Sequence, residues 1–431
     1  MYCNQCSQTV GGIACTKVGV CGKDANIQGL QENLIYALKG ISAYAYNARE
    51  LGYSDTEIDA FLAEGLYSTL TNVDFSLESL FELNLKAGFI NLKAMELLKK
   101  AHVETFGLNE PQKVFTGTVK GPGILVTGHD FKALYELLEQ IKGTNIKVYT
   151  HSEMLPAHGY PVLKSYENLV GNLGKAWWDQ KQLFEEFPGV ILGTSNCVLL
   201  PKDSYKDRFY TVGIPGLPGV KKVEGYNFKP LIEHALKLPE LEDTEGSYLT
   251  TGFSDSNVLP LTDKILSLVK EGKIGHFLLV GGCDAPGKSR NFYRDLVEKA
   301  PENTLILTLA CGKFRFNDLE LGEIDGIPRM LDLGQCNDAI SAINIAVALA
   351  EALNVTVNDL PLTIALSWME QKAVSILMTL LALDIKNIRL GPVLPAWLTP
   401  DLFNILSERY GLRALSLDAD KEWADILGQS K

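Results

Sequence analysis

The sequence lacks any block of lysine and arginine residues in its 431 positions. Its 40 basic residues are outnumbered by 52 acidic ones, which gives a formal net charge of −12. Surfaces that bind nucleic acid or anionic membranes concentrate positive charge. We therefore expect no nucleic acid and no membrane as a partner, and small substrates fit the composition better.

Long apolar runs are lacking as well. The start, MYCNQCSQTV, has no basic segment and no apolar core of a secretory signal. The longest apolar stretch, residues 362–385, is interrupted by Glu370, Gln371 and Lys372, so it does not have the pattern of a spanning helix. These features predict a cytoplasmic location. Disulfides are rare in that reducing compartment, so the eight cysteines are expected to be metal ligands or catalytic thiols.

The spacing of apolar residues is helical in the N-terminal part of the chain and changes near residue 112. Helical spacing over residues 27–41, a capping pair at Ser54 and Glu57, and a third helical stretch over residues 76–102 predict an N-terminal helical bundle. The glycine- and proline-rich stretch 107–123 has the composition of a linker. Beyond it, short apolar runs alternate with helical patterns, which is typical of parallel sheets.

A second break in this pattern, near residues 241–257, separates two such regions. We predict a multidomain α and α/β fold. An N-terminal iron-sulfur and helical bundle domain over 1–112 is followed by two Rossmann-like α/β domains with parallel sheets, over 113–250 and 251–431.

Four cysteines are concentrated at the start of the chain, with the spacing C-x2-C-x8-C-x5-C. They are Cys3, Cys6, Cys15 and Cys21. Four thiolates this close in sequence suit either a tetrahedral zinc ion or an iron-sulfur cluster. Zinc sites usually pair two short cysteine knuckles, and only one is present, so the spacing favours iron-sulfur. Four unrelated buried thiols are the remaining alternative.

The other four cysteines are dispersed, yet each follows an apolar run, as do several other polar residues. The residues placed in this way are His129, Glu153, Cys197, Cys283, Cys311, Cys336, Glu370 and Lys372. Open parallel sheets bind ligands beyond the carboxyl ends of their strands. Sulfur, nitrogen and oxygen donors at one such edge suit an iron cluster with both sulfide-like and oxo-like halves, with an open position for a small substrate.

Ordinary structural roles compete with this interpretation. A single cysteine after a strand often packs as a small core residue, and Glu370 with Lys372 has the composition of a helix start. His151 and His158, which flank Glu153, are expected either to be core residues or to orient that ligand through hydrogen bonds.

Taken together, these residues resemble the hybrid cluster proteins, also called prismane proteins or hydroxylamine reductases. The matching segments are MYCNQC with CTKVGVCGK, TGHD, VYTHSEMLPAH, TSNC, GGCD with KSRNFY, TLACGKFRFN, LDLGQCND and SWMEQKA. They extend from Met1 to the C-terminal stretch GPVLPAWLTPDLFNIL and use all eight cysteines. The short helical region after Cys21 resembles the short subclass of this family.

The resemblance implies two clusters. A [4Fe-4S] cluster would be held by Cys3, Cys6, Cys15 and Cys21, and a hybrid [4Fe-2O-2S] cluster by His129, Glu153, Cys197, Cys283, Cys311, Cys336 and Glu370. Catalytic roles are implied for Glu370, for Lys372 as a proton donor or anion-binding group, and for Cys283, which matches a position that can carry a persulfide.

The implied activity is reduction of hydroxylamine to ammonia and water, with nitric oxide reduction also attributed to the family. Its partners would be a small nitrogenous substrate and an external one-electron donor protein, and a homo-oligomer is compatible with the resemblance. A sensor of redox or nitrosative stress, or a nitrosothiol-transfer protein, would use the same cluster and stays an alternative.

Two further enzyme classes compete. The segment Gly282–Ser289 fits the phosphate-binding pattern G-x4-G-K-S/T, although Cys283 and Asp284 occupy positions where backbone amides would surround a phosphate. ATP binding would identify that class. The nickel-iron carbon monoxide dehydrogenases have a related fold, but Glu153, Glu370 and Lys372 favour the hybrid-cluster interpretation.

Overall fold

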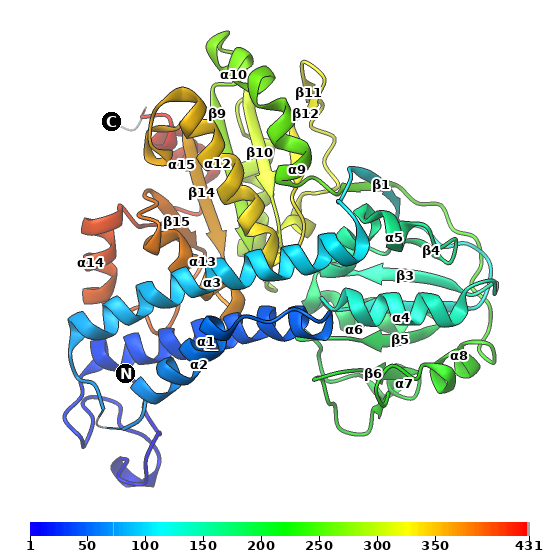
Figure 1. The fold of residues 1–431 in the computed structure, drawn as a ribbon, viewed down its shortest axis with the longest axis horizontal. Coiled ribbons are helices and arrows are strands. Elements are labelled where there is room, and N and C mark those ends of the chain that lie inside the picture. The colour runs from blue at the N-terminus through cyan, green and yellow to red at the C-terminus, as the bar shows by residue number, and fades with distance from the viewer. Residues whose placement is uncertain (72, 429–431) are drawn as a thin grey trace. The chain divides into compact units, whose positions relative to one another are not determined.

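The computed structural model describes residues 1–71 and 73–428 (Figure 1). Contacts divide the chain into two compact units, Met1–Ala101 with Ala350–Lys431, and His102–Leu349. Both contain helices and parallel strands. The predicted multidomain α and α/β fold is therefore confirmed, whereas the boundaries of the three predicted domains stay a prediction.

The predicted N-terminal helices are present in the first unit. They are α1 (Ala25–Glu50), α2 (Thr56–Ser68) and α3 (Leu77–Phe106). The carboxylate of Asp24 caps α1 by accepting a hydrogen bond from the Ile27 amide. The cap of α2 is Asp55, not the predicted Ser54, because the Asp55 carboxylate accepts hydrogen bonds from the first amides of that helix.

The described C-terminal part of the same unit contains parallel strands followed by helices. The strands, in spatial order, are β14 (Leu362–Ser367), β15 (Ile388–Gly391) and β16 (Arg413–Ala414). The helices are α13 (Gln371–Ala382), α14 (Pro400–Tyr410) and α15 (Ala419–Ile426).

Glycines hold α13 close to the N-terminal helices. A Cβ atom at Gly40 of α1 would lie 2.7 Å from the carbonyl oxygen of Gln371, and one at Gly88 of α3 would lie 2.2 Å from that of Met378. Only glycine allows backbones to approach this closely. Helices α1 and α3 therefore fix the position of α13, which carries Lys372.

The second unit contains a sheet whose spatial order is β7-β6-β5-β2-β3-β4-β1-β8. Its strands are β1 (Gln112–Phe115), β2 (Gly123–Thr127), β3 (Lys147–His151), β4 (Leu169–Asn172), β5 (Val190–Gly193), β6 (Phe209–Thr211), β7 (Lys221–Lys222) and β8 (Tyr248–Thr251). All neighbours are parallel except β1 and β8. The central strands β2 and β5 are buried along their whole length, as expected for a parallel sheet covered on both faces.

Helices cover this sheet, and Figure 1 shows α4 lying across its near face. The helices that follow its strands are α4 (Phe131–Ile141), α5 (Pro161–Lys164), α6 (Gln180–Glu186), α7 (Asp203–Lys206) and α8 (Lys229–Ala235). Part of the core consists of Leu125, Tyr149, Phe184, Phe187, Ile191, Tyr205, Phe209 and Leu241. The aromatic rings in this cluster anchor α6 on the sheet.

A second set of parallel strands in this unit has the order β13-β10-β9. They are β9 (His276–Gly282), β10 (Thr304–Thr308) and β13 (Met330–Asp332), and β11 (Glu323–Ile324) with β12 (Ile327–Pro328) forms a small hairpin. The accompanying helices are α9 (Asp255–Val258), α10 (Thr262–Lys270), α11 (Asn291–Glu298) and α12 (Ala339–Leu353).

One helical segment, Cys336–Leu353, is long and apolar enough to cross a membrane by length and composition alone. Of the residues in this segment, 61% are buried within the structure. Burial of this extent is the behaviour of a core helix, and it explains the apolar composition of α12 without a membrane.

Candidate metal centre

The predicted ligands of the second unit follow the carboxyl ends of neighbouring strands. His129, Glu153 and Cys197 come after β2, β3 and β5, which are adjacent in the order β5-β2-β3. The remaining three cysteines of this unit follow β9, β10 and β13, which are also neighbours. The predicted placement at strand ends is therefore confirmed for these six residues.

Three of these side chains converge in the interior. The ligand atoms of His129, Glu153 and Cys336 all lie within 4.8 Å of one another, and all three residues are buried. The Glu153 carboxylate accepts a hydrogen bond of 3.1 Å from the Cys336 amide, and its Oε2 lies 3.4 Å from Cys336 Sγ. The site thus combines nitrogen, oxygen and sulfur donors. No second group this tight occurs in the described part of the chain.

Cys311 lies beside this group. Its Sγ is 3.3 Å from the Oγ of Ser152, the residue that precedes Glu153. Burial raises the pKa of the Cys311 thiol well above its usual range, and the negative charges of Glu153, Cys197 and Cys283 act in the same direction. These groups are therefore near enough to interact electrostatically. A bound cation would relieve their repulsion as the thiols lose their protons.

The ligand-bearing loops share an unusual backbone feature. A left-handed φ occurs at, or one or two residues before, each predicted ligand of this unit, namely at Gly128 (123°), Ser152 (55°), Cys197 (67°), Gly282 (98°), Ala310 (64°) and Gly334 (124°). At Gly128 a Cβ would also lie 2.4 Å from Thr194 Oγ1. Residues with side chains rarely adopt this conformation, and such strain gathers at functional sites.

Side chains that sequence reasoning missed hold the ligands in place. The Oγ of Ser195 accepts a hydrogen bond of 2.8 Å from the His129 amide and lies 2.9 Å from the Nδ1 of that imidazole. The Nε2 of Gln335 donates to the carbonyl oxygens of His129, at 3.2 Å, and Glu153, at 2.6 Å. Such contacts orient metal-binding side chains. The only sign of Ser195 and Gln335 in the sequence was that they lie next to predicted ligands, in the segments TSNC and LDLGQCND.

His151 and His158 do not make the contacts expected of partners of Glu153. His151 Nδ1 lies 2.8 Å from Thr127 Oγ1, and His158 Nε2 lies 2.9 Å from Thr150 Oγ1. Burial lowers the pKa of both imidazoles to about 3, so both are neutral near pH 7. Of the two alternatives for these histidines, the core role therefore fits, and the contacts that orient His129 and Glu153 come from Ser195 and Gln335.

Glu370 and Lys372 lie in the other compact unit, at the start of α13. Lys372 Nζ is 4.0 Å from a carboxylate oxygen of Glu370, and the lysine side chain is nearly buried. The Glu370 side chain makes no capping hydrogen bond to the first turn, so helix capping does not account for it. Their part in the cluster site stays a prediction.

The four N-terminal cysteines are arranged around a short backbone pairing. The amide of Cys3 donates to the carbonyl of Cys15 at 3.0 Å, and the reverse bond measures 2.8 Å. Both residues are buried, whereas Cys6 and Cys21 are partly exposed. Hydrogen bonds from the backbone amides of Val20 and Val10 lower the pKa of the Cys15 thiol. Amides directed at a cysteine sulfur are typical of iron-sulfur ligands, which fits the predicted cluster.

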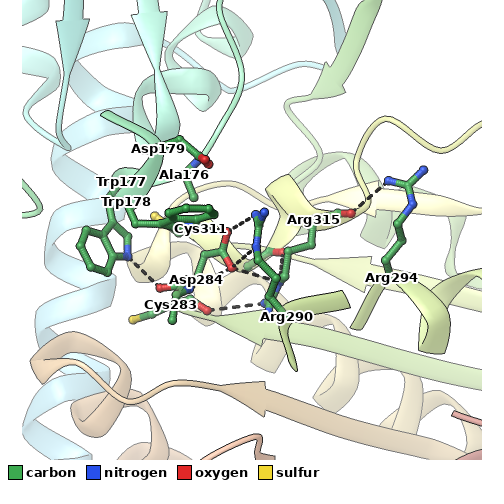
Figure 2. Close-up of polar contacts among 12 residues, drawn as sticks. Ala176, Trp177, Trp178, Asp179, Cys283, Asp284, Arg290, Arg294, Cys311 and Arg315 are labelled. Atoms are coloured by element: carbon green, nitrogen blue, oxygen red, sulfur yellow. Dashed lines mark hydrogen bonds and ion pairs between the residues drawn. The ribbon is translucent and has the colours of Figure 1, made fainter. Parts of the chain in front are cut away.

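The loop after Cys283 has an acidic side chain, Asp284, at its centre. The Asp284 carboxylate accepts hydrogen bonds from the Ala285 amide at 2.9 Å, the Trp178 indole at 3.2 Å and the Arg290 guanidinium at 2.6 Å (Figure 2). One loop amide and the nearby cation are thus directed at an anion of the chain itself, where a phosphate would have to lie. This geometry disfavours the nucleotide-binding alternative.

Comparisons with known proteins agree with the cysteine pattern. The model of the Prismane/CO dehydrogenase family matches residues 1–83 and 52–421. Hydroxylamine reductase from Thermotoga maritima is 60% identical over 428 residues and covers 99% of both chains. The Moorella thermoacetica enzyme of the same name is 58% identical, covering 99% of this chain and 100% of that one.

One relative is longer than this chain. Hydroxylamine reductase from Geobacter metallireducens is 41% identical over 549 aligned positions that cover both chains completely. The alignment is longer than this chain of 431 residues, so that relative contains segments without a counterpart here. Relatives of both lengths therefore exist, as expected for a short subclass.

The fold is shared with more distant proteins. The structure of carbon monoxide dehydrogenase IV from Carboxydothermus hydrogenoformans superposes with a TM-score of 0.78 at 16% identity, covering 99% of this chain and 92% of that one. At this identity the likeness concerns the fold alone.

Proposed function

Because the chain belongs to the Prismane/CO dehydrogenase family, we propose that it is an oxidoreductase that reduces hydroxylamine to ammonia and water at a hybrid iron-sulfur-oxygen cluster. The observation that carries this proposal is the buried convergence of His129, Glu153 and Cys336, with Cys311 beside them, in a chain 60% identical to a hydroxylamine reductase.

The donor set fits such a cluster. Thiolates favour iron-sulfur chemistry, while imidazole and carboxylate favour iron with oxygen ligands. Both kinds of donor are present in the group of His129, Glu153 and Cys336. The residues proposed to hold the hybrid cluster are His129, Glu153, Cys197, Cys283, Cys311, Cys336 and Glu370. When bound, this group would supply electrons and an open iron that polarises the N–O bond. A [4Fe-4S] cluster that passes electrons to the hybrid cluster would be held by the four N-terminal cysteines, Cys3, Cys6, Cys15 and Cys21.

The side chains have their own tasks in this reaction. Cleavage of the N–O bond consumes two electrons and two protons and releases ammonia and water. We assign Lys372 the role of donating a proton to the departing oxygen, on the resemblance and on its nearly buried ammonium beside Glu370. Ser195 and Gln335 keep His129 and Glu153 in position, and the buried Gln335 side chain helps to exclude bulk water.

The electrons would come from an external one-electron donor protein, and we expect a cytoplasmic location. Nitric oxide reduction and a sensor of nitrosative stress remain alternatives because they require the same ligands. Turnover separates an enzyme from a sensor.

The test is steady-state reduction with a chemical one-electron donor under anaerobic conditions. Donor oxidation that depends on hydroxylamine, with ammonia formed at one equivalent per two electrons, supports the proposal. A protein with intact clusters that oxidises no donor when hydroxylamine is added would instead have a sensing role. Nitric oxide in the same assay determines whether it is a second substrate.

A further inference from the structure

The residue after Cys283 is a buried aspartate enclosed by cationic and aromatic groups. The Asp284 side chain is 0% exposed, and Arg290 holds it through two contacts, 2.6 Å to Oδ2 and 3.3 Å to Oδ1. The indole nitrogens of Trp177 and Trp178 donate to its carbonyl and carboxylate, at 2.8 and 3.2 Å. Figure 2 shows these groups converging on Asp284 from several elements.

A second arginine, which is buried, joins this cluster to the Cys311 turn, the 3-10 segment Cys311–Arg315. The Arg315 side chain is 1% exposed, and its Nε lies 3.7 Å from Asp284 Oδ1. Its Nε also donates to the carbonyl of Gly312, which follows Cys311, at 2.8 Å, and its Nη2 reaches the carbonyl of Cys283 at 3.5 Å. The guanidinium stacks on the Tyr293 ring, 4.1 Å from its centroid.

The regular pairing between the strands that lead into these two loops ends before the cysteines. Strands β9 and β10 are paired up to Val280 and Thr308, and the two cysteines lie beyond the last pair. Both loops turn through left-handed residues, Gly282 and Ala310. Strained loops keep their conformation only where surrounding contacts determine it. Arg315 supplies such contacts to both loops at once.

A neighbouring short helical segment connects the loop of a third cysteine, Cys197, to this cluster. The indoles that contact Asp284 belong to the short segment Trp177–Asp179, and the next residue, Gln180, is buried. Gln180 donates to the carbonyl of Cys197, and its Oε1 accepts from the Leu199 amide at 3.1 Å. The network therefore connects the backbones that carry Cys197, Cys283 and Cys311.

We propose that Arg315, anchored by Asp284, is a positioning residue that fixes the loops of Cys283 and Cys311 relative to each other so that both thiols reach the same cluster. This inference rests on the proposed function, since it assumes that both cysteines bind that cluster. Arginine suits the task because its planar guanidinium offers several fixed donors, which a lysine ammonium does not reproduce.

The experiment compares Arg315→Lys, Arg315→Met and Arg294→Met with the parent protein, all purified anaerobically. Arg294 is the matched control, because it donates to the carbonyl of Arg315 at 3.1 Å from the exposed side and pairs with Asp318 at 2.7 Å. The readouts are iron content, the electron paramagnetic resonance spectrum and the midpoint potential of the hybrid cluster, with the N-terminal cluster's signal as the internal standard.

We expect both Arg315 variants to lose at least half of the hybrid-cluster signal or to shift its line shape and potential, while Arg294→Met matches the parent. Since Arg315→Lys keeps the charge, a changed spectrum in that variant would be due to the loss of the guanidinium N–H donors. An unchanged spectrum and potential in both Arg315 variants would overturn the inference. A parent protein without any hybrid signal would instead count against the proposed function.

Iron-free protein gives a second measurement if Arg315→Met does not fold. Hydrogen exchange in residues 281–290 and 309–316 should be about tenfold faster in Arg315→Lys and in Asp284→Asn than in the parent, because the loops lose a shared contact. Arg294→Met should leave residues 281–290 unchanged. Equal exchange of both segments in all four proteins would also overturn the inference.

Discussion

The two groups of cysteines in this chain are built in opposite ways. The N-terminal four come from the first 21 residues and are joined by local backbone contacts, with large apolar side chains such as Val10 and Ile13 exposed around them. The dispersed predicted ligands come from separate loops at strand ends and are held by side-chain hydrogen bonds. A local site depends on spacing, whereas a dispersed site depends on the whole fold.

The largest effect should follow from Glu153→Gln. The variant removes the carboxylate that contacts both the amide and the thiol of Cys336. We expect the hybrid signal to disappear and hydroxylamine turnover to fall by at least about 100-fold, because even groups that only orient metal ligands cost up to that much. The N-terminal cluster's signal should persist. Glu136→Gln, on α4, is the control, and survival of the hybrid signal in Glu153→Gln would remove that carboxylate from the ligand set.

Lys372→Ala should separate proton transfer from cluster binding. If the ammonium donates a proton during N–O cleavage, kcat should fall by about 100-fold with iron content and spectrum unchanged. Lys386→Ala is the control, because that lysine is exposed and pairs only loosely with Asp384 at 3.6 Å. A kcat within twofold of the parent value would exclude this role for Lys372.

Gln335→Ala tests whether the dispersed site depends on its supporting contacts. The amide of Gln335 ties together the backbones of His129 and Glu153, so its loss should weaken iron retention at the hybrid site by about tenfold. Retention is measured by challenge with a chelator, with the N-terminal cluster as the reference. The exposed Gln182→Ala, on α6, serves as the control, and equal loss of iron from both variants would contradict the prediction.

The smallest effect concerns the pH dependence of stability. The pKa of His158 is lowered to about 3 by burial, so the native state holds this imidazole neutral while the unfolded state takes up a proton below about pH 6.5. Its contribution is fully present above that pH and is lost as the pH falls toward 3. The free energy of unfolding should fall by up to about 1.4 kcal/mol per pH unit for this residue.

Denaturant titration of iron-free protein measures this slope. His158→Gln, which removes the titrating group, should have a shallower dependence than the parent between about pH 6 and pH 4. The two proteins should have parallel curves above pH 7. Parallel curves throughout would show that the buried imidazole does not control acid stability.

The sequence predicted the placement of the candidate ligands because they follow a simple rule. Apolar runs identified β2, β3 and β5, and parallel strands present their carboxyl ends at one edge, so the convergence of His129 and Glu153 could be expected. Asp55 replaced Ser54 as a helix cap because neighbouring residues compete for the same amides.

The supporting contacts were beyond prediction. Gln335 reaches His129 across some two hundred positions of the sequence, and Arg315 meets Asp284 only because β9 and β10 are neighbours. Such partners depend on loop geometry, which has no periodic signature. Of the two roles considered for His151 and His158, the buried core role fits, because their rings turn toward threonines on β2 and β3.

The most direct test of the account is the iron and acid-labile sulfide content per chain, measured together with electron paramagnetic resonance on anaerobically purified protein. Two centres predict about eight iron atoms and a signal distinct from that of a [4Fe-4S] cluster. About four iron atoms with a [4Fe-4S] signal alone, or zinc or nickel in place of iron, would show that the dispersed ligands do not bind the proposed cluster.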